Sequence, residues 1–382
     1  MNSTAHEYAH RTHYPFSALV GQEKLKLALL LNVINPQIGG ALVRGERGSA
    51  KTIAVRGLGD VLPEITVVDG CRFSCDPGDI SKMCSLCREA YQAGKKLPAV
   101  KRRMKIIELP VGTTEDRVVG TLNIEKAISE GIKALEIGML AEANRGILYV
   151  DNINLLDDHI MDVLLDAAAM GVNVVEREGV SVSHPAGFIL IGSMNPEEGE
   201  LRPQLNDRLA FHVEVHGIGD LQSRLTIMKQ SMEFDRDPLY FKKLYDAPQG
   251  EIAARIMRAR ALLPRVTIKD QFLRIVARMC IELDVDGHRP DIIITRAAMT
   301  RAAYDGRKQV TEDDVILAAE LTLGFRMRRS PFEEAALGAT RFRQVLEHAK
   351  KVEAERGKEA RTLKQRKADD HMQPAADSAG HE

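Results

Sequence analysis

The chain has 382 residues, with 44% hydrophobic and 28% charged side chains, which is the composition of a globular protein of two or three domains. Its net charge of −1, its lack of Trp and its 4% of aromatic residues argue against a nucleic-acid-binding surface. No apolar run approaches the roughly 20 residues that span a bilayer, and the polar residues 1–13 lack the apolar core of a secretory signal. We therefore expect a cytoplasmic protein that binds neither nucleic acid nor a membrane.

The first 220 residues alternate between strand and helix patterns. An amphipathic helix pattern runs through 14–35, and an apolar run at 41–43 predicts a buried strand that leads into a helix over 51–59. Further strands are predicted at 67–68, 106–109, 147–150 and 188–191, with helices at 124–144, stopped by Gly146, and at 155–169, and a hairpin at 172–182 that turns at 178–179. This alternation predicts an α/β fold with a parallel sheet and helices on both faces.

After residue 220 the patterns are helical only. Thr311 is a good N-cap, because three acidic residues follow it in the first turn. From residue 346 the chain is rich in Lys, Glu, Arg and Ala, which indicates a solvated helix that frays into a disordered tail. The predicted helices are 221–233, 250–261, 267–283, 291–304 and 311–323. We thus expect an α/β domain at 14–235, a small all-helical lid domain with its linker at 236–345, and a charged tail at 346–382.

A phosphate-binding loop is predicted where the first strand ends and a helix begins. Residues 45–52 read Gly-Glu-Arg-Gly-Ser-Ala-Lys-Thr, close to the P-loop pattern. The two glycines allow a tight backbone path, Lys51 can reach the β and γ phosphates, and Thr52 can ligate Mg²⁺. Ala50 departs from the strict pattern, which has Gly there, and the flanking strand and helix disfavour a chance glycine-rich turn. The predicted nucleotide-binding residues here are Gly45, Gly48, Ser49, Ala50, Lys51 and Thr52.

An acidic residue ends the apolar strand at 147–150. Asp151 in this position would hold Mg²⁺ beside the P-loop, together with Thr52. The alternative is a capping residue after a core strand. The next residue is Asn152, where hydrolytic ATPases of this class usually carry Glu. An amide can orient a water molecule but cannot accept its proton.

Three longer blocks, at 109–121, 150–159 and 188–208, resemble the magnesium chelatase I subunit family of AAA+ ATPases. The blocks begin Leu-Pro-Val-Gly-Thr-Thr-Glu-Asp-Arg, Val-Asp-Asn-Ile-Asn-Leu-Leu and Phe-Ile-Leu-Ile-Gly-Ser-Met-Asn-Pro-Glu-Glu-Gly. The resemblance spans about residues 14–345, and it implies an AAA+ α/β domain followed by a helical lid. ATPases of cobalt chelatases share the pattern, and MoxR-type AAA+ proteins share it more weakly.

The resemblance also implies roles for single residues. Asn195 would be the sensor 1 residue that positions the attacking water, and Arg208 would be the arginine finger that reaches a neighbouring subunit's ATP. Together with Asn152 they form the expected catalytic set. Arg289 resembles the sensor 2 residue that binds nucleotide, with Arg296 as the alternative. Arg145 resembles a second interface arginine, although an ordinary surface arginine fits it almost equally well.

The family assembles in a way that implies partners for this chain. Its members form rings, commonly hexamers, that hydrolyse ATP. A second AAA+ subunit carries an integrin-like metal-binding domain, and a large third subunit binds the porphyrin. This sequence has no Asp-x-Ser-x-Ser motif after the lid, so we expect the porphyrin chemistry to lie on another subunit. Segments 113–135 and 172–183 resemble elements that contact partners, with plain scaffold as the alternative.

The resemblance therefore predicts an ATP-hydrolysing motor subunit of a magnesium or cobalt chelatase that drives metal insertion into a tetrapyrrole. Two alternatives stay open. One is a MoxR-like chaperone that loads metal into, or remodels, another enzyme. The other is a regulator that binds ATP and hydrolyses it weakly, a reading that Asn152 favours.

Four cysteines lie close together in an insertion after the second strand. Cys71, Cys75, Cys84 and Cys87 have the spacing C-x₃-C-x₈-C-x₂-C, and Cys280 lies far away in a helical core pattern. In a cytosolic chain, such a cluster indicates a metal site more readily than disulfides. Four thiolates around Zn²⁺ would stabilise a loop too small to hold itself. Free thiols, or a redox pair at Cys84 and Cys87, are the alternatives.

Overall fold

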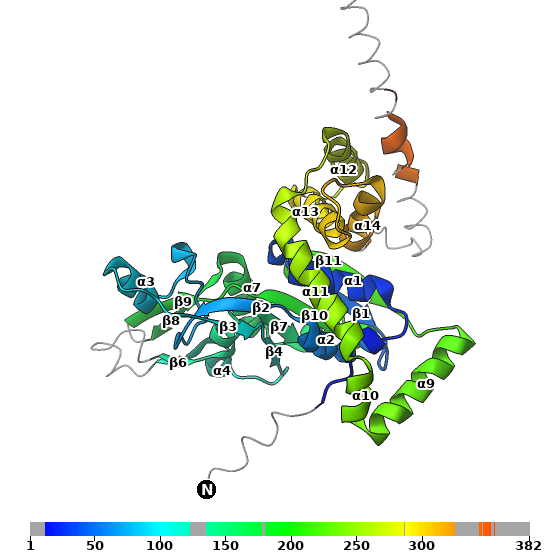
Figure 1. Cartoon of the computed structure of the whole chain (residues 1–382). Helices are drawn as coiled ribbons and strands as arrows, with labels where there is room; N and C mark the ends of the chain where they lie inside the picture. Colours follow the sequence, from blue (N-terminus) through cyan, green and yellow to red (C-terminus); the bar gives the residue numbers. More distant parts are fainter. Residues whose placement is uncertain are drawn as a thin grey trace, which may run out of the picture.

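The computed structural model describes residues 12–122, 135–177, 180–285, 287–324, 344–345, 347–352 and 355. Its centre is a parallel sheet in the order β11-β1-β10-β7-β4 (Figure 1). Every neighbouring pair in this sheet is parallel, so the predicted parallel α/β fold is confirmed. The strands are β1 (Ala41–Gly45), β4 (Ile106–Leu109), β7 (Ile147–Val150), β10 (Ile189–Met194) and β11 (Phe211–Val215). Strand β11 was not among the sequence predictions.

Both faces of the sheet are buried, because successive side chains of each strand enter different cores. Val43 and Tyr149 pack on one side with α1 (Glu23–Ile34) and α2 (Lys51–Leu58). Leu42 and Leu148 pack on the other side, where α7 (Asp158–Met170) lies. Strands buried on both faces have continuous apolar runs rather than an alternating pattern, which is why the sequence revealed most of them.

Among the residues that the structure describes, three pairs of strands lie outside the main sheet, and each pair is antiparallel. The predicted strand at 67–68 belongs to one of them, so it is not part of the central sheet. An insertion that holds the cysteines joins the two strands of that pair. The pairs are β2 (Glu64–Val68) with β3 (Ala99–Arg103), β5 (Gly120–Leu122) with β6 (Leu135–Ile137), and β8 (Val172–Arg177) with β9 (Val180–Pro185).

The predicted helix at 124–144 is wrong at 135–138 and confirmed only at 139–142 among the described residues. Residues 135–137 form β6, and only α6 (Met139–Glu142) is helical, while 123–134 lie outside the described residues. Pairing with β5 overrides the helical pattern, and it brings Gly138 so close to Gly120 that an added Cβ would lie 2.3 Å from the Gly120 nitrogen. Two short helices precede β5 in the chain, α3 (Ser85–Gln92) in the cysteine insertion and α4 (Glu115–Val119).

The carboxyl-terminal part is helical, as predicted. The N-cap at Thr311 is confirmed, because its side chain and that of Asp314 form a reciprocal capping box. Helix α10 was not predicted, and Pro238 at its first position separates it from α9. The helices are α8 (Pro203–Arg208), α9 (Leu221–Arg236), α10 (Pro238–Leu244), α11 (Asp246–Leu262), α12 (Asp270–Glu282), α13 (Arg289–Tyr304) and α14 (Glu312–Leu323).

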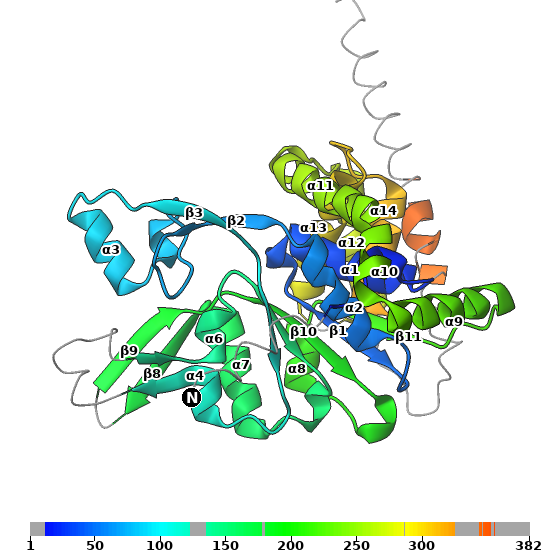
Figure 2. The same cartoon turned by 60° about the horizontal axis from the view of Figure 1, so that its bottom comes forward.

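The lid helices share one hydrophobic core with α1 and with β11. The cysteine insertion and the hairpin β8–β9 lie at the other end of the molecule (Figure 2). Beyond α14, residues 344–345 and 347–352 are helical, in line with the predicted charged helix. Across the described part of the chain, no helix combines the length and the apolar character that a bilayer crossing requires.

Candidate active site

The predicted phosphate-binding loop connects β1 to α2. Gly45 ends the strand, and a Cβ there would lie 2.3 Å from the Val215 carbonyl oxygen, so only glycine fits. Gly48 has a φ of 77° and Ala50 a φ of 64°. The left-handed conformation of Ala50 explains why the usual pattern has Gly there. The backbone thus keeps the P-loop path despite the alanine.

Lys51 lies at the start of α2 and points back into the loop. Its Nζ donates hydrogen bonds to the carbonyl oxygens of Gly45 at 2.5 Å and Glu46 at 2.7 Å. Burial lowers the pKa of Lys51, and the carboxylates of Asp151 and Glu198 partly oppose that effect. The Lys51 ammonium bonds neutral carbonyl oxygens. Its hydrogen bonds become stronger when charged phosphate oxygens replace those carbonyls.

Oxygen atoms from three elements meet beside the loop. The Thr52 hydroxyl lies 3.3 Å from the Asp151 carboxylate. The Tyr149 hydroxyl donates to Thr52 at 3.1 Å and lies 3.0 Å from Asp151, which also accepts a hydrogen bond from Ser193. Burial raises the pKa of Tyr149 to about 12, so its hydroxyl stays a donor at neutral pH. Hydroxyl and carboxylate oxygens suit Mg²⁺, and the structure therefore brings Thr52 and Asp151 together as predicted.

Two further predicted residues lie on the same edge of the sheet. Asn152 has a φ of 53°, which asparagine tolerates better than most side chains, and its N–H donates to the Ser193 hydroxyl at 3.1 Å. Asn195 follows β10, is 3% exposed, and accepts a hydrogen bond from the Glu197 N–H at 3.3 Å. Both therefore lie at the carboxyl ends of neighbouring strands, beside the phosphate-binding loop.

A cavity of about 1060 Å³ opens from the loop at Gly48, Ser49 and Ala50. Its size suits a nucleoside. Its other walls come from the amino-terminal segment, from the stretch after β11, from α9 and from residues of α1, α2, β4 and α10. They include Tyr14, Val20, Gln22, His216, Ile218, Ile227 and Phe234. The amino-terminal segment and α9 lie far apart in the sequence, which left this wall of the site unpredicted.

The predicted arginines lie at the opposite edge of the sheet. Arg208 ends α8 just before β11 begins, and its backbone carbonyl accepts a hydrogen bond from Arg289 Nη2 at 2.9 Å. Arg296 donates to the Gln37 carbonyl oxygen at 2.7 Å. Gly39, which lies against Arg289, precedes β1, whereas the P-loop follows it. Five residues of strand separate these edges by about 16 Å, so the arginines lie far from the P-loop of their own chain.

Comparison with known proteins gives close relatives. Residues 123–215 match the family model for magnesium chelatase, subunit ChlI, and residues 274–346 match the AAA lid domain. A magnesium-chelatase subunit ChlI homolog of Methanocaldococcus jannaschii is 54% identical over 88% of this chain and 92% of that protein. The chain belongs to the magnesium chelatase subunit ChlI family.

Other relatives extend the same result. Magnesium-chelatase subunit ChlI of Nostoc is 50% identical over 86% of the chain and 88% of its own length. A crystal structure from Cytophaga hutchinsonii is 16% identical, with a TM-score of 0.55 over 88% of this chain and 90% of that one, and it shares the fold. As a member of the ChlI family the chain is an AAA+ ATPase of the magnesium-chelatase type that uses ATP and Mg²⁺.

The side chain of Arg145 in this ChlI-family chain makes hydrogen bonds and an ion pair with other residues of the same chain. It precedes β7 and has a φ of 60°. Its guanidinium donates to the carbonyl oxygen of Thr66 at 2.6 Å and of Ser74 at 3.3 Å, and it pairs with Asp76 at 2.7 Å. These acceptors belong to β2 and to the cysteine insertion. Through these contacts Arg145 connects the insertion to β7, the strand that Asp151 directly follows.

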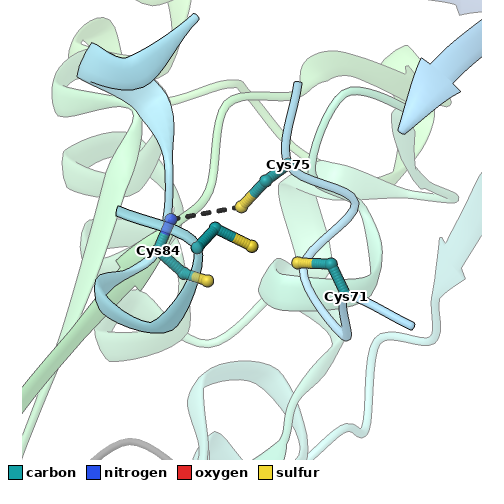
Figure 3. A group of neighbouring side chains, drawn as sticks. Cys71, Cys75 and Cys84 are labelled. Carbon is teal, nitrogen blue, oxygen red and sulfur yellow. Dashed lines mark hydrogen bonds between the residues drawn. The ribbon is translucent and has the colours of Figure 1, made fainter. Parts of the chain in front are cut away.

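The four predicted cysteines of the insertion come together (Figure 3). Their sulfur atoms all lie within 4.8 Å of one another, and the Cys84 N–H lies 3.1 Å from the Cys75 sulfur. All four are free thiols, and three of them are buried. Hydrogen bonds donated by the thiols of Cys75 and Cys84 lower the pKa of Cys71. The same hydrogen bond to Cys71 raises the pKa of the donor, Cys75. Cys280 lies on α12 and is buried in the core of the helical part, away from the cluster.

Proposed function

We propose that this chain forms a ring, commonly a hexamer in such proteins, in which each ATP is bound by one subunit and completed by the next. The position of Arg208 and Arg289 carries this proposal. They lie together on the amino edge of the sheet, while Lys51, Asp151 and Asn195 lie on the carboxyl edge. In a head-to-tail ring, opposite edges of neighbouring subunits face each other, so both arginines reach the phosphates of the adjacent subunit.

The test is complementation between two inactive variants. Lys51→Ala removes the phosphate ligand but leaves Arg208, and Arg208→Ala does the reverse. In an equal mixture, about a quarter of the interfaces pair an intact loop with an intact arginine, so ATPase activity returns to about a quarter of the wild-type level. A mixture as inactive as its two components would contradict the shared site. Mixing Lys51→Ala with the double variant is the matched control, and it should stay inactive.

Residue roles follow from this arrangement. The P-loop residues 45–52 bind the phosphates, Thr52 and Asp151 hold Mg²⁺, Asn195 and Asn152 orient the attacking water, and the arginines stabilise charge on the transferred phosphoryl group. A weakly hydrolysing regulator remains the second candidate, because Asn152 supplies no base. Steady-state turnover of the wild type, compared with Asn152→Glu, separates the two. A large gain from the glutamate would favour the regulator.

We further propose that the motor drives insertion of a divalent metal substrate, Mg²⁺ or Co²⁺, into a tetrapyrrole on a separate subunit. The names of the relatives, which are magnesium-chelatase subunits, support this proposal. The expected partners are an AAA+ subunit with an integrin-like domain and a large porphyrin-binding subunit. Reconstitution with both partners and either metal, followed by tetrapyrrole absorbance, tests the choice. Capture of neither partner would favour the MoxR-like chaperone.

The cysteine cluster is proposed to hold a structural Zn²⁺. Tetrahedral thiolates at 2.3 Å from zinc lie about 3.8 Å apart, so the sulfurs, within 4.8 Å of one another, need only a small contraction. Arg102 faces the cluster with a buried Nε that has no hydrogen-bond partner among the described residues, and the Cys71 thiolate opposes the drop that burial causes in the pKa of Arg102. A cation beside the cluster offsets the excess negative charge of a tetrathiolate site.

Metal analysis of the purified chain tests the zinc proposal. We expect one zinc per chain, and we expect Cys84→Ser to lose it and to lower the melting temperature, because the metal then no longer joins the two halves of the insertion. Cys280→Ser is the matched control, since it removes a buried thiol outside the cluster, and it should retain the metal. A wild-type chain without zinc after growth in zinc-supplemented medium would contradict the proposal.

A further inference from the structure

Helix α9 carries a row of exposed apolar side chains. Leu221, Leu225, Met228 and Met232 follow one another at intervals of four, three and four residues, a spacing that places them on one face of the helix. Leu221 is 67% exposed, Met228 53% and Met232 72%. Within α9, all of whose residues the structure describes, no side chain is buried. Apolar side chains exposed on successive turns mark a surface that binds another protein.

A different face of α9 lines the nucleotide cavity, through Ile227, Gln230 and Phe234. The helix begins six residues after Val215, where β11 ends, so it lies on the carboxyl edge of the sheet with the phosphate-binding loop. In Figure 1, α9 and α10 project at the lower right, away from the lid helices α12 and α13 at the top. In the ring proposed above, the carboxyl edge of one subunit faces the amino edge of the next, so the apolar face of α9 borders that contact.

The amino edge carries an apolar surface of its own, around the turn that connects α12 to α13. Ile281, just before this turn, is 77% exposed, and Ile292, just after it, is 50% exposed. Arg289 begins α13 and donates to the Arg208 carbonyl oxygen at 2.9 Å, which places the turn on the amino edge. Exposed apolar side chains therefore lie on both sides of the proposed head-to-tail contact.

The charges around these two surfaces are opposite. Arg224, Lys229 and Arg236 are exposed on α9, along the borders of the apolar row. Glu282 and Asp284 follow Ile281 at the α12–α13 turn. Opposite charges at the rim of an interface favour the correct pairing, and like charges disfavour the alternatives. A contact between two copies of α9 would bring the basic borders together, whereas a contact between α9 and the lid turn pairs them with acids.

We propose that the exposed face of α9 binds the α12–α13 turn of the next subunit in the ring. The inference rests on the ring proposed above, and it names the surfaces that hold the ring together. The nucleoside lies against one face of α9 and the neighbouring subunit against another. Bound nucleotide therefore steadies the helix on which the neighbour docks, and it favours assembly.

Met232→Glu is the first test, because it places a carboxylate on the apolar face, toward the acidic turn of the next subunit. The free subunit tolerates the change, since this side chain is already 72% exposed. In sedimentation velocity with a slowly hydrolysed ATP analogue, we expect the concentration of half-maximal assembly to rise at least about tenfold. The affinity for MgATP should stay within about threefold of the wild type. Met257→Glu, on α11 and 48% exposed, is the matched control and should assemble normally.

A mixing experiment tests the pairing of the two surfaces. Ile281→Lys places a cation on the lid turn, toward the basic borders of α9, so this variant should also assemble poorly alone. In an equal mixture with Met232→Glu, alternate contacts join two unaltered surfaces or the introduced glutamate to the introduced lysine. The mixture should therefore assemble at a concentration within about threefold of the wild type.

Failure of this inference differs from failure of the ring. A wild type that stays a single chain at every concentration would contradict the ring and the inference together. A wild type that forms rings, alongside a Met232→Glu chain that forms them at the same concentration, would contradict only the docking surface. Normal assembly of Ile281→Lys, with poor assembly of Met232→Glu, would show that α9 binds another surface and would also overturn the proposal.

Discussion

At the scale of single residues, the phosphate-binding loop is arranged around the positive charge of Lys51. The ammonium bonds two loop carbonyls, and burial lowers its pKa. A phosphate oxygen replaces these neutral acceptors with a charged one, which strengthens each hydrogen bond. In the proposed site, the ammonium of Lys51 would thus exchange loop carbonyls for phosphate oxygens when the nucleotide arrives.

Lys51→Ala should weaken MgATP binding by about 10- to 100-fold, as expected for the loss of charge-assisted hydrogen bonds worth about 1.5–3 kcal/mol. Turnover should disappear with it. Titration calorimetry with MgATP measures the effect. Lys24→Ala is the control, because Lys24 pairs with Glu320 on the surface at 2.8 Å and should bind nucleotide normally. Unchanged affinity in Lys51→Ala would refute the assignment of the site.

His184 makes stability depend on pH. It is 1% exposed, stacks on Phe73 at 5.3 Å, and burial lowers its pKa below 6.5. The unfolded chain therefore takes up the proton first as pH falls, so unfolding becomes easier below about pH 6.5, by at most about 1.4 kcal/mol per pH unit. Denaturant unfolding of His184→Gln between pH 7 and 5 should show a smaller loss than the wild type. His216→Gln, at an exposed site, should match the wild type.

The sequence identified the site residues that form contiguous motifs and missed those that only the fold assembles. Lys51, Thr52 and Asp151 were recognisable because a strand, a loop and a helix surround them in a fixed order. Tyr149 and Ser193 looked like ordinary residues of buried strands, and only the adjacency of β7 and β10 brings them to Asp151. Glu198 lies inside the resembling block at 188–208, but its contact with Arg47, 151 positions away, became evident only with the fold.

At the scale of elements, the cap of α14 could be predicted from the sequence, whereas the pairing partners of the short strands could not. A helix cap depends on four consecutive residues and can be predicted from them. The partners of β2 and β6 cannot be predicted from the residues of those strands alone. Strand β2 alternates between exposed and buried residues at its start, which is typical of a strand with one solvated face rather than a central one.

Thr311→Ala should destabilise the lid by about 1 kcal/mol, because the hydroxyl no longer caps α14. The side chain of Asp314, which accepts from the Thr311 N–H at 2.8 Å, keeps half of the capping box. Thermal unfolding of the full chain measures the loss. Thr295→Ala offers the comparison, since that hydroxyl bonds the Asp291 carbonyl within a helix and its removal should cost little. Equal melting temperatures for the wild type and Thr311→Ala would contradict the capping role.

At the scale of the whole molecule, the proposed phosphate-binding residues and the proposed arginines lie on opposite edges of the sheet. Their separation follows from parallel strands, whose carboxyl ends all meet on one side. The residues of both edges could be named from motifs and family resemblance, but the edge on which each lies became evident only with the strand order. Arg289 in particular follows a long helical stretch, and nothing in its local sequence tells which edge it approaches.

A shared site makes turnover depend on assembly. ATPase activity per chain should therefore rise with protein concentration and then level off, as separate subunits, whose sites lack the arginines, join into rings. Activity per chain that is constant from nanomolar to micromolar concentration, with a single-chain mass in light scattering, would exclude this arrangement. Arg208→Ala should remain near the low-concentration value throughout.

The attachment of the cysteine insertion has a mechanical consequence. Arg145 and Asn144 grip the insertion just before β7, with the Asn144 amide donating to the Phe73 carbonyl oxygen at 2.6 Å. The four buried residues of β7 follow, and Asp151, the residue proposed to hold Mg²⁺, comes directly after them. A partner protein that pulled on the insertion would therefore act on one end of a strand about 13 Å long, whose other end leads to that proposed magnesium site.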